Sequence, residues 1–386
     1  MIRENKQQVL VIAGETSSSL YALRVIQKLK ESHPDLHFFG VGSKAMEAEG
    51  FECVGRSEDM AVMGLQEVVS HYFEIKKIFN KLVDLVKTRK PSFILLLDYS
   101  GFNLRFAEKV HGQGVPIVYY ISPQLWAWRT GRVQIVKKFI DKMLVVFPFE
   151  RTFYEQHGVT VEFVGHPLLD ELTEDLYETS MRNENRSRYG FNLNDKVIGL
   201  LPGSRTSELK MNLESQIRAA EILYRKNRQL KFIVAVAPNF TIEEFKTHLP
   251  DIKDLPLVLV KKDPFEMIRM ADVVLTASGT ATLMVGLMHT PMVIMYKMKP
   301  LTAWLAKKLV KGTKYFGMIN LILGEEVCKE LFQENAAPEI MAAELENLLD
   351  ESVYVEKVNK LKRVNQLLGE KGATERVVEH LTKYLK

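Results

Sequence analysis

The sequence has little cysteine, no long apolar run and almost no excess of either charge. Its 386 residues include only Cys53 and Cys328, in no Cys-x-x-Cys pair, so neither a disulfide framework nor a zinc site is predicted. No apolar run reaches the roughly 18 residues of a spanning helix, and no signal-peptide core is present near Met1. The 52 basic residues barely outnumber the 48 acidic ones, which argues against nucleic acid as a partner. We expect a cytoplasmic protein whose membrane contact is peripheral.

Short β-branched runs alternate with amphipathic stretches along most of the chain. This alternation is typical of parallel sheets covered by helices. A polar, charged stretch between Glu171 and Asn194 separates two such series. We therefore predict an α/β fold of two Rossmann-like, doubly wound domains facing each other across a cleft: residues 1–170, and residues 171–352, with a helix over about 353–386 packing back on the first. The expected strands are 8–13, 36–41, 93–97, 117–121, 142–147, 161–164, 196–201, 231–237, 257–260, 273–276 and 292–296.

Two turns that suit an anion follow strands of the second domain. The turn 203–205 is Gly-Ser-Arg, and the turn 278–280 is Ser-Gly-Thr. Glycine allows close backbone approach, hydroxyl groups and helix N-termini bind phosphate, and arginine offers a forked donor. Either turn alone is also compatible with an ordinary helix cap, but the two together predict a bound nucleoside diphosphate. The predicted donor-binding residues are Gly203, Ser204, Arg205, Ser278, Gly279 and Thr280.

The first domain carries polar and aromatic residues after its strands. Asp98 ends the apolar run 93–97, and a partly desolvated carboxylate of this kind suits a general base. A hydroxyl-rich turn follows the first strand, and a turn with two tryptophans follows the run 117–121. Such turns suit sugars and acyl chains, although helix caps and a hydrophobic plug remain alternatives. The predicted acceptor residues are Gly14, Glu15, Thr16, Ser17, Ser122, Trp126 and Trp128.

Two further patterns permit more than one interpretation. The stretch Met60–Lys81 has apolar residues at helical spacing and three lysines near its end. A helix of this kind lies either on an anionic membrane surface or, more commonly, in a protein core. The pattern Gly40-x-Gly42 matches a dinucleotide fingerprint loosely and on the wrong strand, which disfavours an oxidoreductase. No Asp-x-Asp pair is present, so we expect no metal and no cofactor.

Taken together, these segments resemble lipid-A-disaccharide synthase, a family of inverting glycosyltransferases with two Rossmann domains in the GT-B arrangement. The segments occur in the family's order between about residues 10 and 345. They are Ala13–Ser17, Met60–Gly64, Ile121–Arg129, Phe147–Glu150, Phe163–Pro167, Leu200–Arg205, Ala277–Leu283 and Lys329–Gln333.

The resemblance implies a function in lipid A and lipopolysaccharide biosynthesis. A member of this family joins UDP-2,3-diacylglucosamine to 2,3-diacylglucosamine 1-phosphate, releases UDP and forms a β-1,6 disaccharide without a metal. The resemblance adds Asn320 and Gln333 to the residues that would bind UDP, and it makes Asp98 the base for the acceptor hydroxyl. It also implies an anionic membrane surface as a partner, at the inner face of the inner membrane.

The sequence departs from the family pattern at three positions where an acid is usual: Ser19, Gly101 and Met284. Without an acid at Gly101, we expect Asp98 to lack a like-charge neighbour and to be a weaker base. The departures leave a second interpretation open, a divergent paralogue that binds a lipid-linked or nucleotide sugar with altered or no turnover. A third is a transferase or epimerase that acts on a UDP sugar without acyl chains. The sequence fixes neither the acyl-chain length nor a homodimer.

Overall fold

The computed structural model describes residues 7–57, 68–127, 130–252, 254–298 and 315–385. The chain divides into two compact units. The N-terminal unit consists of Met1–Asp170 and Leu368–Lys386, and the C-terminal unit of Glu171–Leu367. The return to the N-terminal unit lies at Leu368 instead of at about residue 353, so the last part of the chain is shared by both units.

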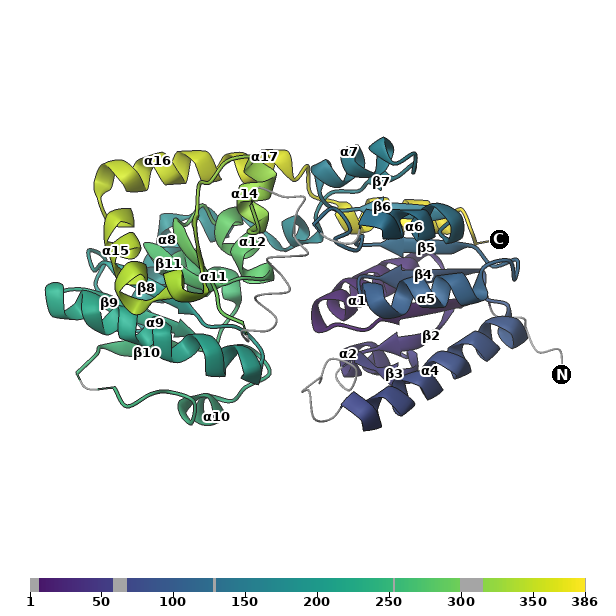
Figure 1. Cartoon of the computed structure of the whole chain (residues 1–386), viewed down its shortest axis with the longest axis horizontal. Coiled ribbons are helices and arrows are strands. Elements are labelled where there is room, and N and C mark those ends of the chain that lie inside the picture. Colours follow the sequence, from purple (N-terminus) through teal and green to yellow (C-terminus); the bar gives the residue numbers. More distant parts are fainter. Residues whose placement is uncertain (1–6, 58–67, 128–129, 253, 299–314, 386) are drawn as a thin grey trace. The chain divides into compact units, whose positions relative to one another are not determined.

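The N-terminal unit contains a parallel sheet with strand order β3-β2-β1-β4-β5-β6-β7 among the described residues (Figure 1). Valine, isoleucine, leucine and aromatic residues fill its central strands because helices cover both faces. The sequence did not predict β3, an edge strand whose side chains are only partly buried. The strands are β1 (Gln8–Ala13), β2 (His37–Gly42), β3 (Glu52–Arg56), β4 (Phe93–Leu97), β5 (Ile117–Tyr120), β6 (Lys142–Val145) and β7 (Glu162–Phe163).

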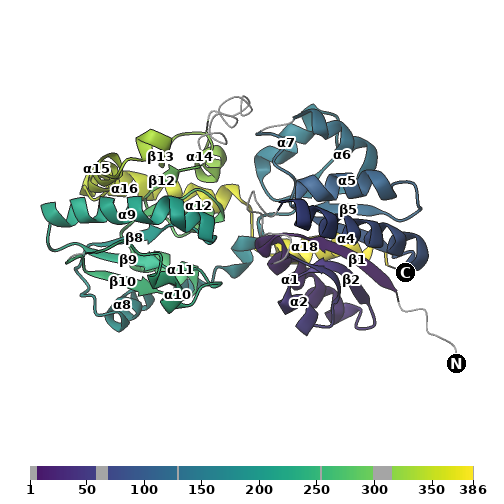
Figure 2. The same cartoon turned by 60° about the horizontal axis from the view of Figure 1, so that its bottom comes forward.

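Helices cover both faces of this sheet. On one face α4 contacts α5 and α5 contacts α6, and on the other α1 contacts both α2 and α18 (Figures 1 and 2). The described helices are α1 (Thr16–Ser32), α2 (Lys44–Ala48), α4 (Val68–Arg89), α5 (Ser100–Val110), α6 (Val133–Phe139), α7 (Pro148–Gln156) and α18 (Ala373–Thr382), with the short 3-10 helices η1 (Thr130–Arg132) and η2 (Pro167–Glu171).

The last helix, α18, is fixed to the N-terminal unit by one carboxylate. Asp170 accepts hydrogen bonds from the backbone N–H groups of Gly372 (2.7 Å), Ala373 (3.1 Å) and Thr374 (3.0 Å). These donors begin the helix and have no partner within it, so the carboxylate both satisfies them and complements the helix dipole. The expectation that a C-terminal helix packs on the first unit thus applies to α18 alone.

The C-terminal unit contains a second parallel sheet, with strand order β10-β9-β8-β11-β12-β13 among the described residues. Its strands are β8 (Val197–Leu201), β9 (Lys231–Ala235), β10 (Leu257–Val260), β11 (Val273–Ala277), β12 (Met292–Tyr296) and β13 (Lys329–Phe332). Its helices are α8 (Thr179–Arg188), α9 (Thr206–Lys226), α10 (Ile242–Lys246), α11 (Pro264–Met270), α12 (Thr280–Leu287), α14 (Met318–Leu323), α15 (Pro338–Leu348), α16 (Glu351–Leu361) and α17 (Arg363–Leu367), with η3 (Glu174–Tyr177) and η4 (Gln333–Ala336).

The polar stretch after residue 170 is part of the C-terminal unit and forms α8. Its Arg186 is only 2% exposed. The guanidinium donates to the Met270 carbonyl (2.8 Å) and to the Asp272 carboxylate (2.8 Å), and a buried arginine needs such partners. The charged stretch at which the second domain was expected to begin therefore includes a structured helix of the C-terminal unit.

In each sheet the strand register brings the carboxyl ends of neighbouring strands to one level. Ala13 pairs with Leu97, and Leu97 pairs with Tyr120, so the loops after β1, β4 and β5 begin side by side. In the C-terminal unit Leu201 pairs with Thr276, and Ala277 pairs with Met295. The prediction of two doubly wound parallel sheets is confirmed. None of the described helices is long and apolar enough to cross a membrane.

Candidate functional site

Asp98 lies at the carboxyl end of β4 with a backbone conformation that few residues adopt. Asp98 (φ 46°) and Tyr99 (φ 41°) both lie in the left-handed region, which costs a residue with a β carbon about 1 to 2 kcal/mol. The side-chain amide of Asn103 donates to the carbonyls of Leu97 (3.0 Å) and Asp98 (2.9 Å). The hydroxyl of Tyr119 also donates to the Asp98 carbonyl. These hydrogen bonds hold the backbone of the strained turn, which places the Asp98 side chain at the sheet edge.

The Asp98 carboxyl has the acidity of a general base that works near neutral pH. Burial, together with the neighbouring Glu15 carboxylate, raises the pKa of Asp98 to about 7, against the effect of a hydrogen bond from the Tyr99 backbone. The expectation that Asp98 lacks a like-charge neighbour is therefore wrong, because Glu15 supplies one, although burial contributes more to the raised pKa. A pKa near the working pH favours proton transfer.

The loop after β1 packs closely on the Asp98 turn. A β carbon at Gly14 would lie 2.5 Å from the Tyr99 ring, so only glycine fits there. The Glu15 N–H donates to the Ser18 hydroxyl (3.1 Å), which donates to the Glu15 carbonyl (2.9 Å). Ser17 is partly exposed. The side chain of Thr16 lies outside the described residues.

The three departures from the family pattern have different surroundings. Ser19 is only 3% exposed, so an acid at this position would have to be buried. A β carbon at Gly101 would meet nothing within 4 Å, so space does not account for the glycine, and nothing in the structure explains it. Met284 is half-buried in α12.

Ser122 and Trp126, which follow β5, are directed into the N-terminal unit. The Ser122 hydroxyl lies 3.0 Å from the Tyr154 hydroxyl and is buried. The Trp126 ring packs edge-on against Phe149, with ring centroids 5.0 Å apart. Both residues therefore support the loop from inside the N-terminal unit. Trp128 lies outside the described residues.

In the C-terminal unit, a carboxylate already binds the first predicted anion turn. Gly203 has φ 120°, and a β carbon there would lie 2.6 Å from Cβ of Glu208. Oε2 of Glu208 accepts from the N–H groups of Ser204 (2.8 Å) and Arg205 (3.2 Å). Two of the backbone donors expected to bind phosphate are thus used by the protein. The sequence has the pattern typical of this cap, because Glu208 lies three residues after Arg205, the residue that precedes the helix.

Arg205 keeps its guanidinium at the surface of the same turn. Its side chain is 60% exposed and forms a long ion pair with Glu208, 3.4 Å from Nη1 to Oε1. The turn itself is held from below by Asn212, whose amide donates to the Pro202 carbonyl (2.9 Å). A forked, exposed cation on a fixed turn is suited to binding a diphosphate.

The second predicted anion turn is open at the surface. Ser278, Gly279 and Thr280 are exposed, and Gly279, with φ 148°, precedes the first turn of α12. A β carbon at Gly279 would meet nothing within 4 Å. The N–H groups at the start of a helix attract anions, so this turn retains the chemistry that the sequence predicted.

Asn320 and Gln333, by contrast, use their side chains within the protein. The buried Asn320 amide donates to the Cys328 carbonyl and the Glu330 carboxylate (both 2.7 Å) and accepts from the N–H groups of Val327 and Cys328 (both 2.9 Å). The Gln333 amide accepts from the Met298 N–H (3.0 Å) and donates to its carbonyl (2.9 Å). Both side chains therefore have hydrogen-bond partners within the protein, and their contacts with UDP stay a prediction.

Glu330 on β13 is a residue of this edge that the sequence did not single out. Its carboxylate accepts hydrogen bonds from the N–H groups of Phe316 and Gly317, both at 3.0 Å, besides the one from Asn320. It therefore fixes the segment that leads into α14. Its only sequence signal was its place in the segment Lys329–Gln333.

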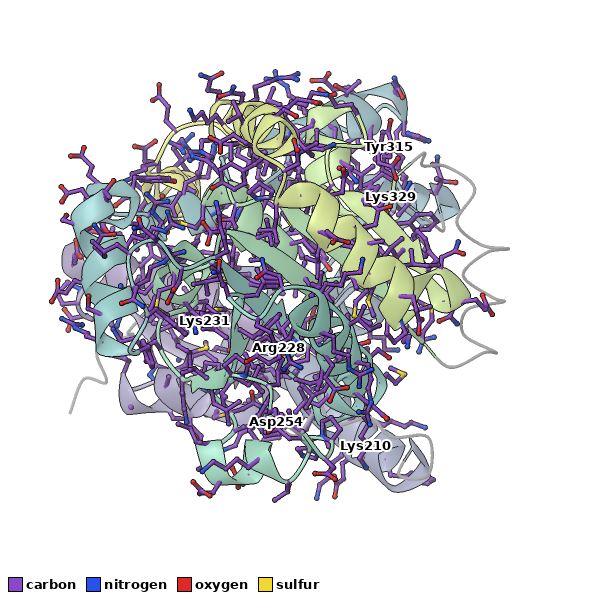
Figure 3. All side chains as sticks on the ribbon, turned by 90° about the vertical axis from the view of Figure 1, so that its left-hand side faces the viewer. Lys210, Arg228, Lys231, Asp254, Tyr315 and Lys329 are labelled. Carbon is purple, nitrogen blue, oxygen red and sulfur yellow. The ribbon has the colours of Figure 1, made fainter. Side chains whose placement is uncertain are left out.

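A hollow of about 400 Å³ on the C-terminal unit is not part of this edge. It is lined by Arg218, Arg225 and Arg228 together with Asp251 and Asp254, among others, and Figure 3 shows Arg228 and Asp254 on this side of the unit. Its residues lie on the second half of α9 and beyond, whereas the donor turn is at the start of that helix. Among the described residues, no group of three or more His, Cys, Asp or Glu side chains could hold a metal ion.

The comparison with protein families covers almost the entire chain. Residues 9–379 match the family described as Lipid-A-disaccharide synthetase. The chain belongs to this family. The lipid-A-disaccharide synthase of Geobacter metallireducens is 38% identical over 372 residues, which are 96% of this chain and 95% of the relative. Members of the family are glycosyltransferases of lipid A biosynthesis, so this chain is a hexosyltransferase of the same pathway.

Solved structures agree with this family in fold. The UDP-GlcNAc 2-epimerase from Neisseria meningitidis, solved with UDP-GlcNAc, is 14% identical and has a TM-score of 0.63, covering 98% of this chain and 100% of that chain. MurG from Acinetobacter baumannii is also 14% identical, with a TM-score of 0.58 and coverage of 98% and 99%. At this identity the likeness shows that the lipid-A-disaccharide synthetase chain has a GT-B fold.

Proposed function

We propose that this chain joins UDP-2,3-diacylglucosamine to 2,3-diacylglucosamine 1-phosphate, releases UDP and forms the β-1,6-linked disaccharide. Family membership over residues 9–379 supports the reaction. The observation that carries the chemistry is the Asp98 carboxyl, fixed at the sheet edge beside Glu15 with its pKa raised to about 7 by burial first and by Glu15 second.

In the proposed reaction Asp98 is the general base. The 6-hydroxyl oxygen of the acceptor forms a bond to the anomeric carbon of the donor as the bond from that carbon to the diphosphate oxygen breaks. UDP leaves with the electron pair, and the proton of the hydroxyl passes to the Asp98 carboxylate. A base fixed within hydrogen-bond distance of the hydroxyl typically contributes 10²- to 10⁴-fold to such a transfer.

The proposed donor site is the carboxyl edge of the C-terminal sheet. The exposed guanidinium of Arg205 would bind the diphosphate, with Ser278, Gly279 and Thr280 offering hydroxyl and backbone donors at the start of α12. Charge on the leaving diphosphate grows as the bond breaks, so donors fixed in advance lower the barrier. These groups require neither a metal nor a cofactor.

The proposed location is the inner face of an anionic membrane, where both acylated substrates would be met. The support comes from α4, whose Phe73 is 64% exposed and is followed by the exposed Lys76, Lys77 and Lys81. Aromatic and basic side chains at one end of a helix attract it to an anionic lipid surface. The side chains of Val68, Val69 and Tyr72 lie outside the described residues.

Product formation tests the proposed function. The purified protein, given both diacylated sugars in detergent micelles without added metal, should release UDP and form a disaccharide in equal amounts, and either sugar alone should give no disaccharide. UDP release without disaccharide would indicate hydrolysis, and no turnover of either sugar would favour the divergent paralogue. No observation on the structure favours that paralogue or an epimerase.

A further inference from the structure

A second buried carboxyl group lies at the same sheet edge as Asp98 and has no part in the proposed reaction. Glu150, near the start of α7, is 1% exposed. Burial raises its pKa to about 7, while backbone hydrogen bonds and the side chains of Ser122 and Trp126 oppose this effect. Burying a carboxyl group without a neighbouring cation costs free energy. Its hydrogen-bond partners therefore indicate which part of the fold it stabilises.

One oxygen of Glu150 begins a helix. Oε2 accepts hydrogen bonds from the N–H groups of Val146 (3.2 Å) and Phe147 (3.1 Å), which connect β6 to α7. This cap is an ordinary helix-starting interaction and would be kept by any side chain with an oxygen at the same place.

The carboxyl group also faces the loop that follows β5. Hydrogen bonding from the side chains of Ser122 and Trp126 lowers its pKa. The buried indole nitrogen of Trp126 has no other hydrogen-bond partner among the described residues. The Ser122 hydroxyl lies 3.0 Å from the Tyr154 hydroxyl on α7, so this loop and the helix are joined through a small polar network.

The network connects a buried acid with the predicted acceptor loop. Trp126 is 9% exposed, and its ring packs against Phe149, the neighbour of Glu150. The loop therefore rests on α7 through one aromatic contact and through the polar groups of Glu150 and Tyr154. The polar contacts restrict the orientation of the loop more than ring packing does, because hydrogen bonds depend more strongly on direction.

We propose that Glu150 is a positioning residue that holds residues 121–127 in the conformation that binds the acceptor sugar. This inference rests on the proposed function in one respect, the assignment of this loop to the acceptor. Glu150 touches neither substrate nor the reacting atoms in this account. Its effect reaches the acceptor through Ser122 and Trp126.

The substitution Glu150→Gln separates the cap from the loop contact. The glutamine oxygen can still accept from Val146 and Phe147, whereas its NH₂ group, a donor, would face the Ser122 hydroxyl and the Trp126 indole N–H in place of an acceptor oxygen. Glu244→Gln is the matched control. Glu244 occupies the same place in the cap of α10, accepting from the Thr241 N–H (2.7 Å), but contacts no predicted site residue.

The first measurement is hydrogen exchange of the full-length protein without substrate. In Glu150→Gln the amides of residues 121–127 should exchange at least about fivefold faster, while those of α7 keep their wild-type rates. Glu244→Gln should leave both segments unchanged. Unchanged exchange over residues 121–127 in Glu150→Gln would overturn the inference.

The second measurement is steady-state kinetics with each sugar varied in turn. Glu150→Gln should raise the KM for the acceptor about tenfold and leave the KM for the donor and kcat within about twofold, because the loss is confined to acceptor binding. Ser122→Ala should cost less in the Glu150→Gln protein than in the wild type, since its contact with Glu150 is already broken and only the contact with Tyr154 is left. Equal losses for both sugars would show a merely structural role and contradict the inference.

Two outcomes need a further variant or a different conclusion. If Glu150→Gln also loosens α7, Ser122→Ala alone decides, because it leaves the cap intact: faster exchange and a raised acceptor KM support the inference, and wild-type values overturn it. If the loop loosens but the acceptor KM stays unchanged, the loop does not bind the acceptor and the inference fails, whereas disaccharide formation by the wild type would still uphold the proposed function.

Discussion

The turn at Asp98 shows how single residues are arranged to present one reactive group. Two consecutive residues with positive φ are unfavourable unless surrounding groups stabilise them. Here Asn103 and Tyr119 satisfy the carbonyl groups that the turn leaves unpaired, and the absence of a side chain at Gly14 leaves room for Tyr99. The strain at Asp98 is thus stabilised by residues that need not touch a substrate.

Arg205 provides the clearest test of the donor site at the scale of a residue. We expect Arg205→Ala to weaken UDP binding by roughly 1.5 to 3 kcal/mol, the usual contribution of a charged hydrogen bond. Isothermal titration calorimetry with UDP measures this loss directly. Arg225→Ala, which removes an exposed arginine from the other end of α9, should bind UDP as the wild type does. Equal affinity in a folded Arg205→Ala protein would exclude Arg205 from the site.

The sequence identified residues that stand at strand ends but not the partners that those residues have. Asp98 and Arg205 were predicted because strand-to-loop positions are visible in the residue pattern. The proximity of Glu15 to Asp98 and the hydrogen bond from the Ser204 N–H to Glu208 depend on loop geometry, which the residue pattern does not show. For the same reason Asn320 was assigned to UDP, although its hydrogen bonds are made within the protein.

Among the structural elements, α4 is the one whose surface has a predicted partner. We expect the variant Phe73→Ser, Lys76→Glu, Lys77→Glu to bind vesicles with phosphatidylglycerol at least about tenfold more weakly, because each basic residue near an anionic surface contributes on the order of 1 kcal/mol. Co-sedimentation with these vesicles measures the change. Because the Phe73 side chain is 64% exposed, we expect this variant to stay folded.

A charge-matched control separates this surface from a general effect of charge. The double variant Lys87→Glu, Lys109→Glu reverses two exposed lysines away from the start of α4. It should keep most of the vesicle binding. If both variants lose binding equally, attraction depends on total charge, and the account of α4 as the docking element is wrong.

At the scale of elements, buried strands were easier to predict than an edge strand or a buried charge. Continuous apolar runs such as Phe93–Leu97 have few alternatives to a buried strand. The edge strand β3 lacks such a run, and the polar composition of α8 did not indicate that its Arg186 is buried. The charge of Arg186 is accommodated by Asp272 and by the backbone carbonyls of Met270, Leu193 and Asp195. No sequence pattern shows these partners.

The whole molecule combines two sheets of the same architecture with different chemistry at their carboxyl edges. In the N-terminal unit a carboxyl of raised pKa stands beside a second acid, which suits removal of a proton. In the C-terminal unit an exposed guanidinium and an open helix start suit a diphosphate. A transfer between two glycolipids requires this division of roles. The chain's membership of the lipid-A-disaccharide synthetase family indicates which transfer it is.

The most direct test of this account is the rate of disaccharide formation by Asp98→Asn as a function of pH. Below a pH of about 7 the wild-type base becomes protonated. The value of kcat/KM should therefore decrease as the pH is lowered, by about tenfold per pH unit well below pH 7. Asp98→Asn keeps the shape of the side chain without its basicity. We predict that it lowers kcat by about 10² to 10⁴ and removes this pH dependence, with UDP affinity unchanged. An active wild type whose Asp98→Asn variant retains most of the rate and the same pH profile would contradict the account.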